Sequence, residues 1–335
     1  MIDSSPQDVI ADVVEQFVRE ELSHDNLHIA RAVANILEAG GKRLRPRITM
    51  LAGRAREPSA AEDPVLASYM ELIHIATLIH DDVLDRADTR RGRDSTNAAH
   101  GNRFSVLAGD YLFAWVFKKI TQAYAAPIPT ILSAMLAEIC NGEVKQLRAA
   151  GDLGLSRERY GEIIGKKTAE LFASCAEVGA IDALQQTGAT PSADLRDDAG
   201  VKALRAYGWE FGMGFQIRDD VLDIVADQSA LGKPAGLDLR ERRVTLPLIA
   251  ELALGDASMR SEVQRAFAAA DEEGHAGTTV GRLVDRLRAG RGVELAKIAV
   301  AEHAAAAQAA LLALPASAAR DELARLAQTL TSFSS

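Results

Sequence analysis

Apolar residues recur every three to four positions along most of the chain, which is the spacing of one face of an α-helix. No segment shows a convincing strand-like alternation of apolar and polar residues. Residues that break helices cluster in predicted loops at 56–63, 187–191, 227–243 and 274–278. The pattern predicts helices at 8–22, 26–39, 46–55, 64–85, 105–123, 127–149, 156–185, 193–227, 246–254, 259–270, 280–288, 290–314 and 317–330.

The composition agrees with a helical protein. Aromatic residues make up only 5% of the chain, whereas Ala and Leu, which are strong helix formers, are abundant. No linker with a shift in composition separates the helices, so residues 1–335 are predicted to form one all-α domain, a bundle of about ten to thirteen helices.

Charge and hydropathy exclude two classes of protein. The net charge of −9 argues against general nucleic-acid binding. No apolar run reaches the roughly 18 residues of a membrane span, because Glu71 and His74 interrupt the longest candidate, at 65–79. Cys140 and Cys175 lie in Ala-rich segments without metal-ligand spacing, which predicts reduced, buried thiols and a cytoplasmic location.

The sequence Asp-Asp-Val-Leu-Asp occurs twice, at 81–85 and 219–223. On a helix, the first and last Asp of each copy share one face, with Cβ atoms about 5–6 Å apart. Carboxylates gathered after an apolar stretch repel one another unless a cation lies between them. Mg²⁺ suits such oxygens, since it binds one or two carboxylates together with substrate phosphates. Two such clusters facing each other would hold a diphosphate through several metal ions, whereas one copy alone is equally compatible with a solvated helix end.

Basic residues lie near several predicted loops and helix ends. Gly40 and Gly41 end one helix and Pro46 begins the next, which places Lys42 and Arg45 near a helix N-terminus, where anions bind. The other cations are Arg86, Arg90, Arg91, Lys166, Lys167 and Lys233. Arginine forms bidentate contacts with phosphate oxygens, so the set predicts a site for two diphosphate-bearing substrates, although each cation alone is also compatible with solvated surface charge.

These motifs resemble the trans-isoprenyl diphosphate synthase family, which includes farnesyl, geranylgeranyl and longer polyprenyl diphosphate synthases. The resemblance covers about residues 40–247. It implies an isoprenoid synthase type I fold with a central catalytic cavity, three Mg²⁺ ions that Mn²⁺ can replace, and a homodimer. Besides the two acidic copies it rests on the motifs Gly-Gly-Lys-Arg-Leu-Arg-Pro from Gly40, Arg-Arg-Gly from Arg90, Gly-Asp-Tyr-Leu from Gly109, Lys-Thr-Ala from Lys167, Phe-Gln from Phe215, Gly-Lys-Pro from Gly232 and Asp-Leu-Arg-Glu from Asp238.

The same resemblance implies a role for each matching residue. Carboxylates would bind the metal ions, with Asp81, Asp85 and Asp219 as ligands and Asp82, Asp220 and Asp223 in support. The allylic diphosphate would be held by Arg90, Lys167 and Lys233. Isopentenyl diphosphate would be held by Lys42, Arg45, His74 and Arg91. The reaction centre would be lined by Thr168 and Gln216.

The implied reaction begins when the allylic diphosphate (farnesyl, geranylgeranyl or geranyl) ionises, and the double bond of isopentenyl diphosphate then meets the carbocation. Ala76 and Thr77, five and four residues before Asp81, are small, as in the long-chain members of the family. This predicts an all-trans product of about 30–50 carbons for a quinone side chain, with peripheral membrane contact at release. Candidates for the floor of the product pocket, which core packing explains equally well, are Tyr69, Met70, Leu132 and Met135.

Several alternatives stay open from the sequence. A farnesyl or geranylgeranyl synthase, or the catalytic subunit of a heteromeric synthase, would share the same motifs. A class I terpene cyclase would normally carry an Asn/Ser/Glu-type second metal motif, and a silent subunit would lose aspartates. A di-iron bundle is indicated only by the Glu-x-x-His spacing of Glu71 and His74 and by Glu272 to His275 in a Gly-containing loop.

Overall fold

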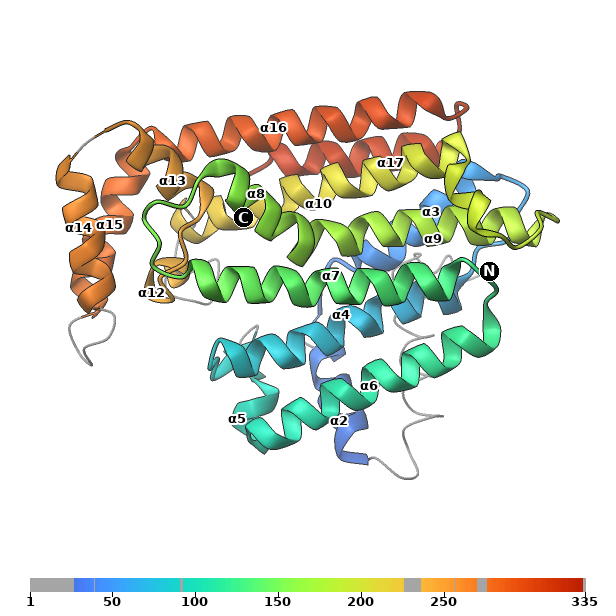
Figure 1. Cartoon of the computed structure of the whole chain (residues 1–335), viewed down its shortest axis with the longest axis horizontal. Helices are drawn as coiled ribbons and strands as arrows, with labels where there is room; N and C mark the ends of the chain where they lie inside the picture. The colour runs from blue at the N-terminus through green and yellow to red at the C-terminus, as the bar shows by residue number, and fades with distance from the viewer. Residues whose placement is uncertain are drawn as a thin grey trace. The chain divides into compact units, whose positions relative to one another are not determined.

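The computed structural model describes residues 27–38, 40–90, 93–225, 236–255, 257–269 and 276–333, and these residues are predominantly helical (Figure 1). The all-α prediction is therefore confirmed, while the helix predicted at 8–22 lies outside the described residues. The α-helices are α2 Leu27–Glu38, α3 Leu44–Arg56, α4 Pro64–Leu84, α5 Thr96–His100, α6 Asn102–Ala123, α7 Ile128–Ala149, α8 Arg157–Ile164, α9 Glu170–Gln186, α10 Ala199–Val225, α12 Leu237–Arg240, α13 Leu246–Ala253, α14 Ala257–Ala269, α15 Ala276–Ala289, α16 Gly292–Ala310 and α17 Ala318–Gln328.

The chain divides into two compact units. The first comprises residues 1–132, 175–204 and 314–320, and the second comprises 133–174, 205–313 and 321–335. The boundaries fall inside α7, α9, α10 and α17. The single domain expected from the sequence stays a prediction.

Helix α4 organises the first unit. Asp63 caps its start, because the Asp63 carboxylate accepts the backbone N–H groups of Val65 and Leu66 at 2.9 and 2.8 Å, and Pro64 fits the first turn. Most of its apolar residues between Leu66 and Ile79 are buried. The helix packs against α3 and α6 (Figure 1). The helix ends at the first acidic copy, with Asp85 as its C-cap, so the packed core fixes where these carboxylates lie.

A short antiparallel pair of strands follows α4. Strand β1, Thr89–Arg90, pairs with β2, Arg93–Asp94. The sequence analysis found no strand here, because two residues per strand are too few to show an alternating pattern. The pair turns the chain back after α4 and places Arg90 next to the end of that helix.

In the second unit, α16 packs on α13, and the hydroxyl of Tyr207 on α10 donates to the carbonyl of Leu323 at 2.8 Å. The stretch Gly292–Ala313, which contains α16, is long and apolar enough to cross a membrane by length and composition alone, and about a third of it is buried in the fold. The sequence analysis missed this stretch because its apolar character comes mainly from Ala.

The predicted helix at 156–185 is interrupted by a π-helical turn, η1, at Gly165–Ala169. The backbone N–H of Glu170 donates to the carbonyl of Gly165, five residues earlier, which is the π-helical hydrogen bond. This turn contains Lys166, Lys167 and Thr168. Other differences are smaller: 3₁₀ turns lie at Ala193–Asp197, Leu311–Ala313 and Thr329–Thr331, and α5 precedes α6.

The two cysteines differ in their surroundings. Cys175 is buried, as predicted, and burial raises the pKa of its thiol to about 12. Cys140, in contrast, is exposed on α7, so its predicted burial is wrong. The error arises because an Ala-rich helical segment indicates a helix but does not show which of its faces is covered.

We predict that Gly142 on α7 is required for the close approach of the π-helical turn. A Cβ atom at Gly142 would lie 2.5 Å from the backbone nitrogen of Lys167. Gly142→Ala should therefore lower the free energy of unfolding by about 1–3 kcal/mol through overpacking, measured by denaturant or thermal unfolding.

Gly281→Ala on α15 is the matched control. A Cβ atom there meets no atom within 4 Å, so this substitution should raise stability by about 0.4–1 kcal/mol. Equal effects of the two substitutions would contradict the packing argument.

Candidate active site

The first acidic copy lies at the C-terminal end of α4. Asp81 and Asp85 are half-buried, and the backbone N–H of Asp85 donates to the carbonyl of Asp81 at 2.8 Å. Asp82 is fully buried and accepts a hydrogen bond from Nε of Arg90 at 2.7 Å. Arg90, which the sequence analysis expects on the allylic diphosphate, is thus ion-paired with the middle aspartate in this structure.

The basic turn before α3 has an unexpected anchor. Arg43 adopts a left-handed backbone conformation (φ 45°), and its guanidinium contacts the carboxylate of Glu71 at 2.6 Å. Both side chains are almost entirely buried, so the pair ties the turn to α4. Lys42 is exposed and Arg45 half-buried beside this anchor. The pair also gives Glu71 a role that does not involve the di-iron ligand set.

Further back along α4, His74 is half-buried and its carbonyl accepts the hydroxyl of Thr77 at 2.7 Å. Ala76 is completely buried. The four candidates for the pocket floor are also buried, as core packing alone would require, so that hypothesis stays a prediction: Tyr69, Met70, Leu132 and Met135.

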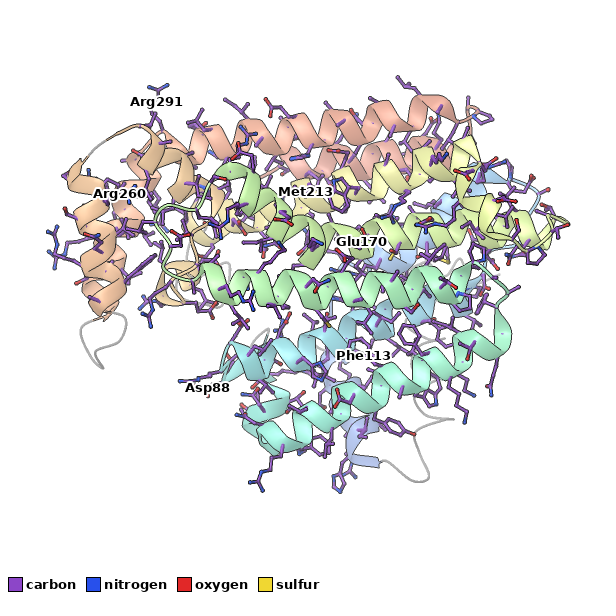
Figure 2. All side chains as sticks on the ribbon, in the orientation of Figure 1. Asp88, Phe113, Glu170, Met213, Arg260 and Arg291 are labelled. Carbon is purple, nitrogen blue, oxygen red and sulfur yellow. The ribbon has the colours of Figure 1, made fainter. Side chains whose placement is uncertain are left out.

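Another group of polar and aromatic side chains in the first unit surrounds His80, directly before the first acidic copy. Its Nε2 atom lies 3.1 Å from the carbonyl of Val106 and 3.4 Å from a carboxylate oxygen of Asp110. The ring also packs against Phe113, which Figure 2 shows on α6, with ring centroids 5.7 Å apart. These contacts join the end of α4 to α6.

The second acidic copy lies in the last turns of α10. Asp219 is exposed, Asp220 is buried and Asp223 is half-buried. Both carboxylate oxygens of Asp223 accept backbone N–H groups, from Leu237 and Asp238, each at 3.1 Å. Asp223 therefore anchors the start of α12 to α10, a role that the sequence analysis did not foresee.

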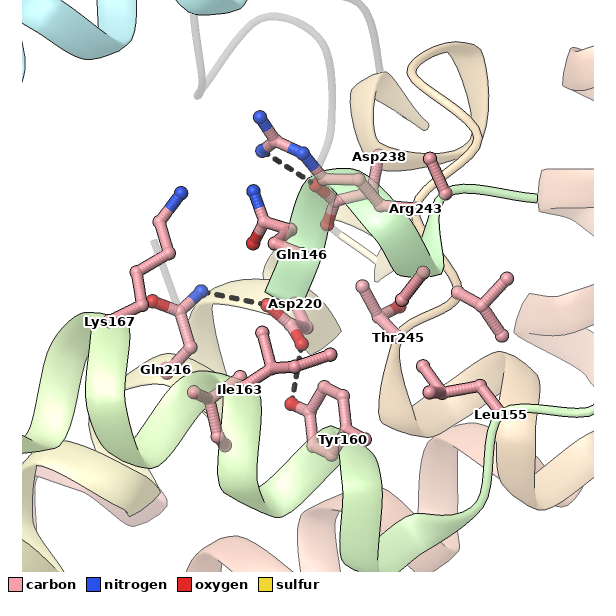
Figure 3. A pocket seen from close by; sticks show the side chains of 14 residues that line it. Gln146, Leu155, Tyr160, Ile163, Lys167, Gln216, Asp220, Asp238, Arg243 and Thr245 are labelled. Atoms are coloured by element: carbon pink, nitrogen blue, oxygen red, sulfur yellow. Dashed lines mark hydrogen bonds and ion pairs between the residues drawn. The ribbon is translucent and has the colours of Figure 1, made fainter. Parts of the chain in front are cut away.

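A pocket in the second unit opens beside this copy (Figure 3). Apolar side chains of α8 form part of its wall. The polar and charged side chains that line it include Tyr160, Lys167, Gln216, Asp220, Asp238 and Arg243. The pocket thus gathers two cations and two carboxylates from segments that are up to 76 residues apart, as the difference between positions 167 and 243 shows.

A chain of hydrogen bonds runs through the wall of the pocket. The hydroxyl of Thr168 donates to Oε1 of Gln216 at 2.8 Å, and Nε2 of Gln216 donates to Oδ1 of Asp220 at 2.9 Å. The hydroxyl of Tyr160 donates to Oδ2 of Asp220 at 2.6 Å. Thr168 and Gln216, which were expected to lie together at the reaction centre, do contact each other.

Burial and mutual repulsion shift the titration of these groups. Burial, with the negative charge of Asp238, raises the pKa of Asp220 well above its usual value, and the hydrogen bonds from Tyr160 and Gln216 oppose this rise. The same two causes raise the pKa of Asp223 to about 7. Burial beside Asp220 raises the pKa of Tyr160, which keeps its hydroxyl protonated. The fold therefore disfavours the charged form of both carboxyl groups, and a nearby cation would favour it.

The two lysines of the π-helical turn have different environments. Lys167 pairs with Glu143 on α7 at 2.6 Å, both side chains being 17% exposed, and Lys167 lines the pocket. Lys166 pairs with the more exposed Glu138 and is not among the residues that line the pocket. Two further expected ligands of diphosphate, Arg91 and Lys233, lie outside the described residues.

Two residues that line this pocket, Arg243 and Tyr160, were not among the site residues predicted from the sequence. Arg243 contacts the carboxylates of Asp238 and Glu241 at 3.5 and 2.8 Å. Its neighbour Arg242 has a positive φ of 56°, which marks a tight turn. Tyr160 belongs to none of the sequence motifs, and only its contact with Asp220 identifies it as part of the site.

A family model described as polyprenyl synthetase matches residues 26–280. The chain belongs to the polyprenyl synthetase family. Octaprenyl diphosphate synthase of Escherichia coli is 35% identical over 94% of this chain and 93% of its own length. The nonaprenyl diphosphate synthase of Mycobacterium tuberculosis is 33% identical over 90% and 86%. A crystal structure of a polyprenyl synthase from Caulobacter crescentus, complexed with calcium and isoprenyl diphosphate, aligns with a TM-score of 0.86 at 34% identity, covering 96% of this chain and 94% of that one.

The carboxylates of this polyprenyl synthetase fit the divalent cation on which the family depends. Within the described residues, no three side chains of His, Cys, Asp or Glu converge into a ready-made metal site. Carboxylate oxygens suit Mg²⁺, which keeps waters and completes its coordination with substrate phosphates. Asp219 is exposed and Asp81 and Asp85 are half-buried, so these carboxylates are accessible to a cation.

We predict that Lys167 rather than Lys166 contributes to the reaction. Lys167→Met should lower kcat/KM for the allylic diphosphate about 30- to 100-fold, since it removes a charged hydrogen bond in a partly buried pocket. Lys166→Met is the matched control from the same turn and should stay within threefold of wild type. Steady-state kinetics measure both variants, and a larger loss in Lys166→Met would contradict the assignment.

Proposed function

We propose that this polyprenyl synthetase condenses isopentenyl diphosphate head to tail with an allylic diphosphate and releases an all-trans polyprenyl diphosphate of about 30–50 carbons. One observation mainly supports this proposal. Both acidic copies contain all three aspartates, in a chain that aligns over 94% of its length with an octaprenyl diphosphate synthase. A quinone side chain is the proposed use of the product.

The small residues before the first acidic copy support a long product. Ala76 is fully buried on α4 and Thr77 is half-buried, so neither side chain fills much space below Asp81. A solved decaprenyl diphosphate synthase from Rhodobacter capsulatus aligns with a TM-score of 0.83 at 35% identity, over 97% of this chain and 98% of that one. A decaprenyl product of that enzyme agrees with the long-chain product proposed for this chain.

The proposed mechanism assigns the charged residues to one diphosphate. Asp81, Asp85 and Asp219 would hold three Mg²⁺ ions, which supply Lewis-acid stabilisation of the leaving pyrophosphate. Lys167 and Arg90 would bind the same phosphate oxygens, and Arg90 would exchange its partner Asp82 for them.

The remaining residues bind the second substrate and protect the cation. Lys42, Arg45, His74 and Arg91 would hold isopentenyl diphosphate at close range, which makes the bond-forming step effectively unimolecular. Apolar residues of the pocket, such as Ile163, exclude water that would otherwise trap the carbocation. The amide and hydroxyl oxygens of Gln216 and Thr168 would face the developing positive charge, and the departing pyrophosphate would accept the proton.

We also propose that the enzyme is a cytoplasmic homodimer. On α7, the exposed residues Ala137, Cys140, Val144 and Leu147 follow one another at intervals of three or four, which is the spacing of a helix–helix seam. The side chains of Val144 and Leu147 are 46% and 58% exposed, as expected for a surface that a second copy covers. Sedimentation equilibrium measures the mass of the assembly directly.

The direct test is incubation with isopentenyl diphosphate, farnesyl diphosphate and Mg²⁺, followed by sizing of the products by chromatography. We expect all-trans polyprenyl diphosphates of about 30–50 carbons, released with one pyrophosphate per added unit, and no reaction after EDTA treatment. Shorter products, of about 15 or 20 carbons, would instead favour a farnesyl or geranylgeranyl synthase. Activity that requires a second protein would favour a heteromeric synthase, and a cyclised hydrocarbon would overturn the proposal.

We predict that Ala76→Phe shortens the product by at least one or two isoprene units, because the ring would occupy space beside α4 that the growing chain needs. Thr77→Ser is the matched control, since it keeps a small side chain and the hydroxyl that bonds the carbonyl of His74. Product sizing distinguishes the two, with thermal unfolding to confirm that both variants fold. An unchanged product from folded Ala76→Phe would show that the chain does not pass Ala76.

A further inference from the structure

Tyr160 has no role in the motifs of the family resemblance, yet it touches the second acidic copy. Its side chain lies on α8 and is 4% exposed, and its hydroxyl donates to Oδ2 of Asp220 at 2.6 Å. The other oxygen of Asp220, Oδ1, accepts from Nε2 of Gln216 at 2.9 Å. Each oxygen of this buried carboxylate therefore accepts a hydrogen bond from a different donor (Figure 3).

Two donors on opposite oxygens hold the carboxylate plane in one orientation. A single donor would leave Asp220 free to rotate about its side-chain bonds, whereas the Tyr160 ring on α8 is almost completely buried. Both hydrogen bonds lie away from bulk water, where a hydrogen bond is electrostatically stronger than at the surface. Tyr160 thus determines where Oδ1 of Asp220 points.

The position of Oδ1 then fixes the amide of Gln216. Nε2 of Gln216 donates to Oδ1 of Asp220 at 2.9 Å, so the NH₂ end of the amide faces the carboxyl group. The amide oxygen Oε1 consequently faces the hydroxyl of Thr168, from which it accepts at 2.8 Å. The order Tyr160, Asp220, Gln216, Thr168 has one consistent set of donors and acceptors.

We propose that Tyr160 is a positioning residue for the condensation: through Asp220 it holds the Gln216 amide in the orientation that the reaction requires, on the pocket wall that also carries Lys167. The proposal rests on the function proposed above. Tyr160 itself need not touch either substrate, because its effect passes through two hydrogen bonds. Its removal should slow the chemical step more than it weakens substrate binding.

The test is Tyr160→Phe, which keeps the ring and removes only the hydroxyl. We expect kcat to fall about tenfold, because the lost hydrogen bond ends on a buried carboxyl group, while KM for both substrates stays within about twofold. Tyr207→Phe is the matched control in the same unit. Tyr207 is also fully buried and donates one hydrogen bond, at 2.8 Å, but to the carbonyl of Leu323.

Both variants remove one buried hydroxyl, so thermal unfolding should show a similar loss of stability, and only Tyr160→Phe should lose turnover. An unchanged kcat in Tyr160→Phe, or an equal fall in both variants, would overturn the positioning role. A Tyr160→Phe protein that fails to fold while Tyr207→Phe folds would make the hydroxyl structural and would also overturn it.

A double-mutant cycle with Gln216→Met tests whether Tyr160 acts through Gln216. Methionine keeps the length of the side chain and removes the amide. If Tyr160 works by orienting that amide, then Tyr160→Phe should cause no further fall in kcat once Gln216→Met is present. If the two substitutions lower kcat independently, so that their fold-changes multiply in the double mutant, the proposal is contradicted. Failure of the proposed function would show already in the wild-type enzyme, whereas failure of this inference shows only in the variants.

Discussion

The requirement that every buried carboxylate meet a donor or a cation governs both acidic copies. Three aspartates within five residues cannot all share one apolar helix end without compensation. In each copy the middle aspartate is buried and receives protein donors, from Arg90 for Asp82 and from Tyr160 and Gln216 for Asp220. Of the more exposed outer aspartates, Asp81, Asp85 and Asp219 are the proposed metal ligands, whereas both oxygens of Asp223 accept backbone N–H groups.

This division separates two tasks that the sequence presents as one motif. The middle aspartates join the helix end to neighbouring segments, in one case the strand after α4 and in the other the wall formed by α8. Asp223 joins a third segment, α12, through the backbone of Leu237 and Asp238. A repeated pentad can therefore serve as scaffold and ligand set together, because the helical period turns its members toward different neighbours.

Sequence reasoning recovered the helices and the motif residues because both depend on local patterns and short spacings. It placed Thr168 and Gln216 together, and they are in contact. It did not find Tyr160 or the Arg43–Glu71 pair, since contacts across 60 and 28 residues leave no signal in spacing. The π-helical turn was also missed, because one extra residue in a turn hardly changes an apolar pattern. The ligand roles that were assigned from the sequence stay predictions.

The π-helical turn and the glycine opposite it explain how one lysine of an adjacent pair comes to line the pocket. The wider turn changes the angular step between residues, so Lys167 and Lys166 pair with glutamates five positions apart on α7. Gly142 lets α7 approach the backbone of Lys167 where any side chain would collide. Main-chain packing therefore holds the backbone of Lys167, and Glu143 holds its ammonium at 2.6 Å. In the proposed mechanism, such preorganisation would lower the entropy lost when the diphosphate binds and ionises.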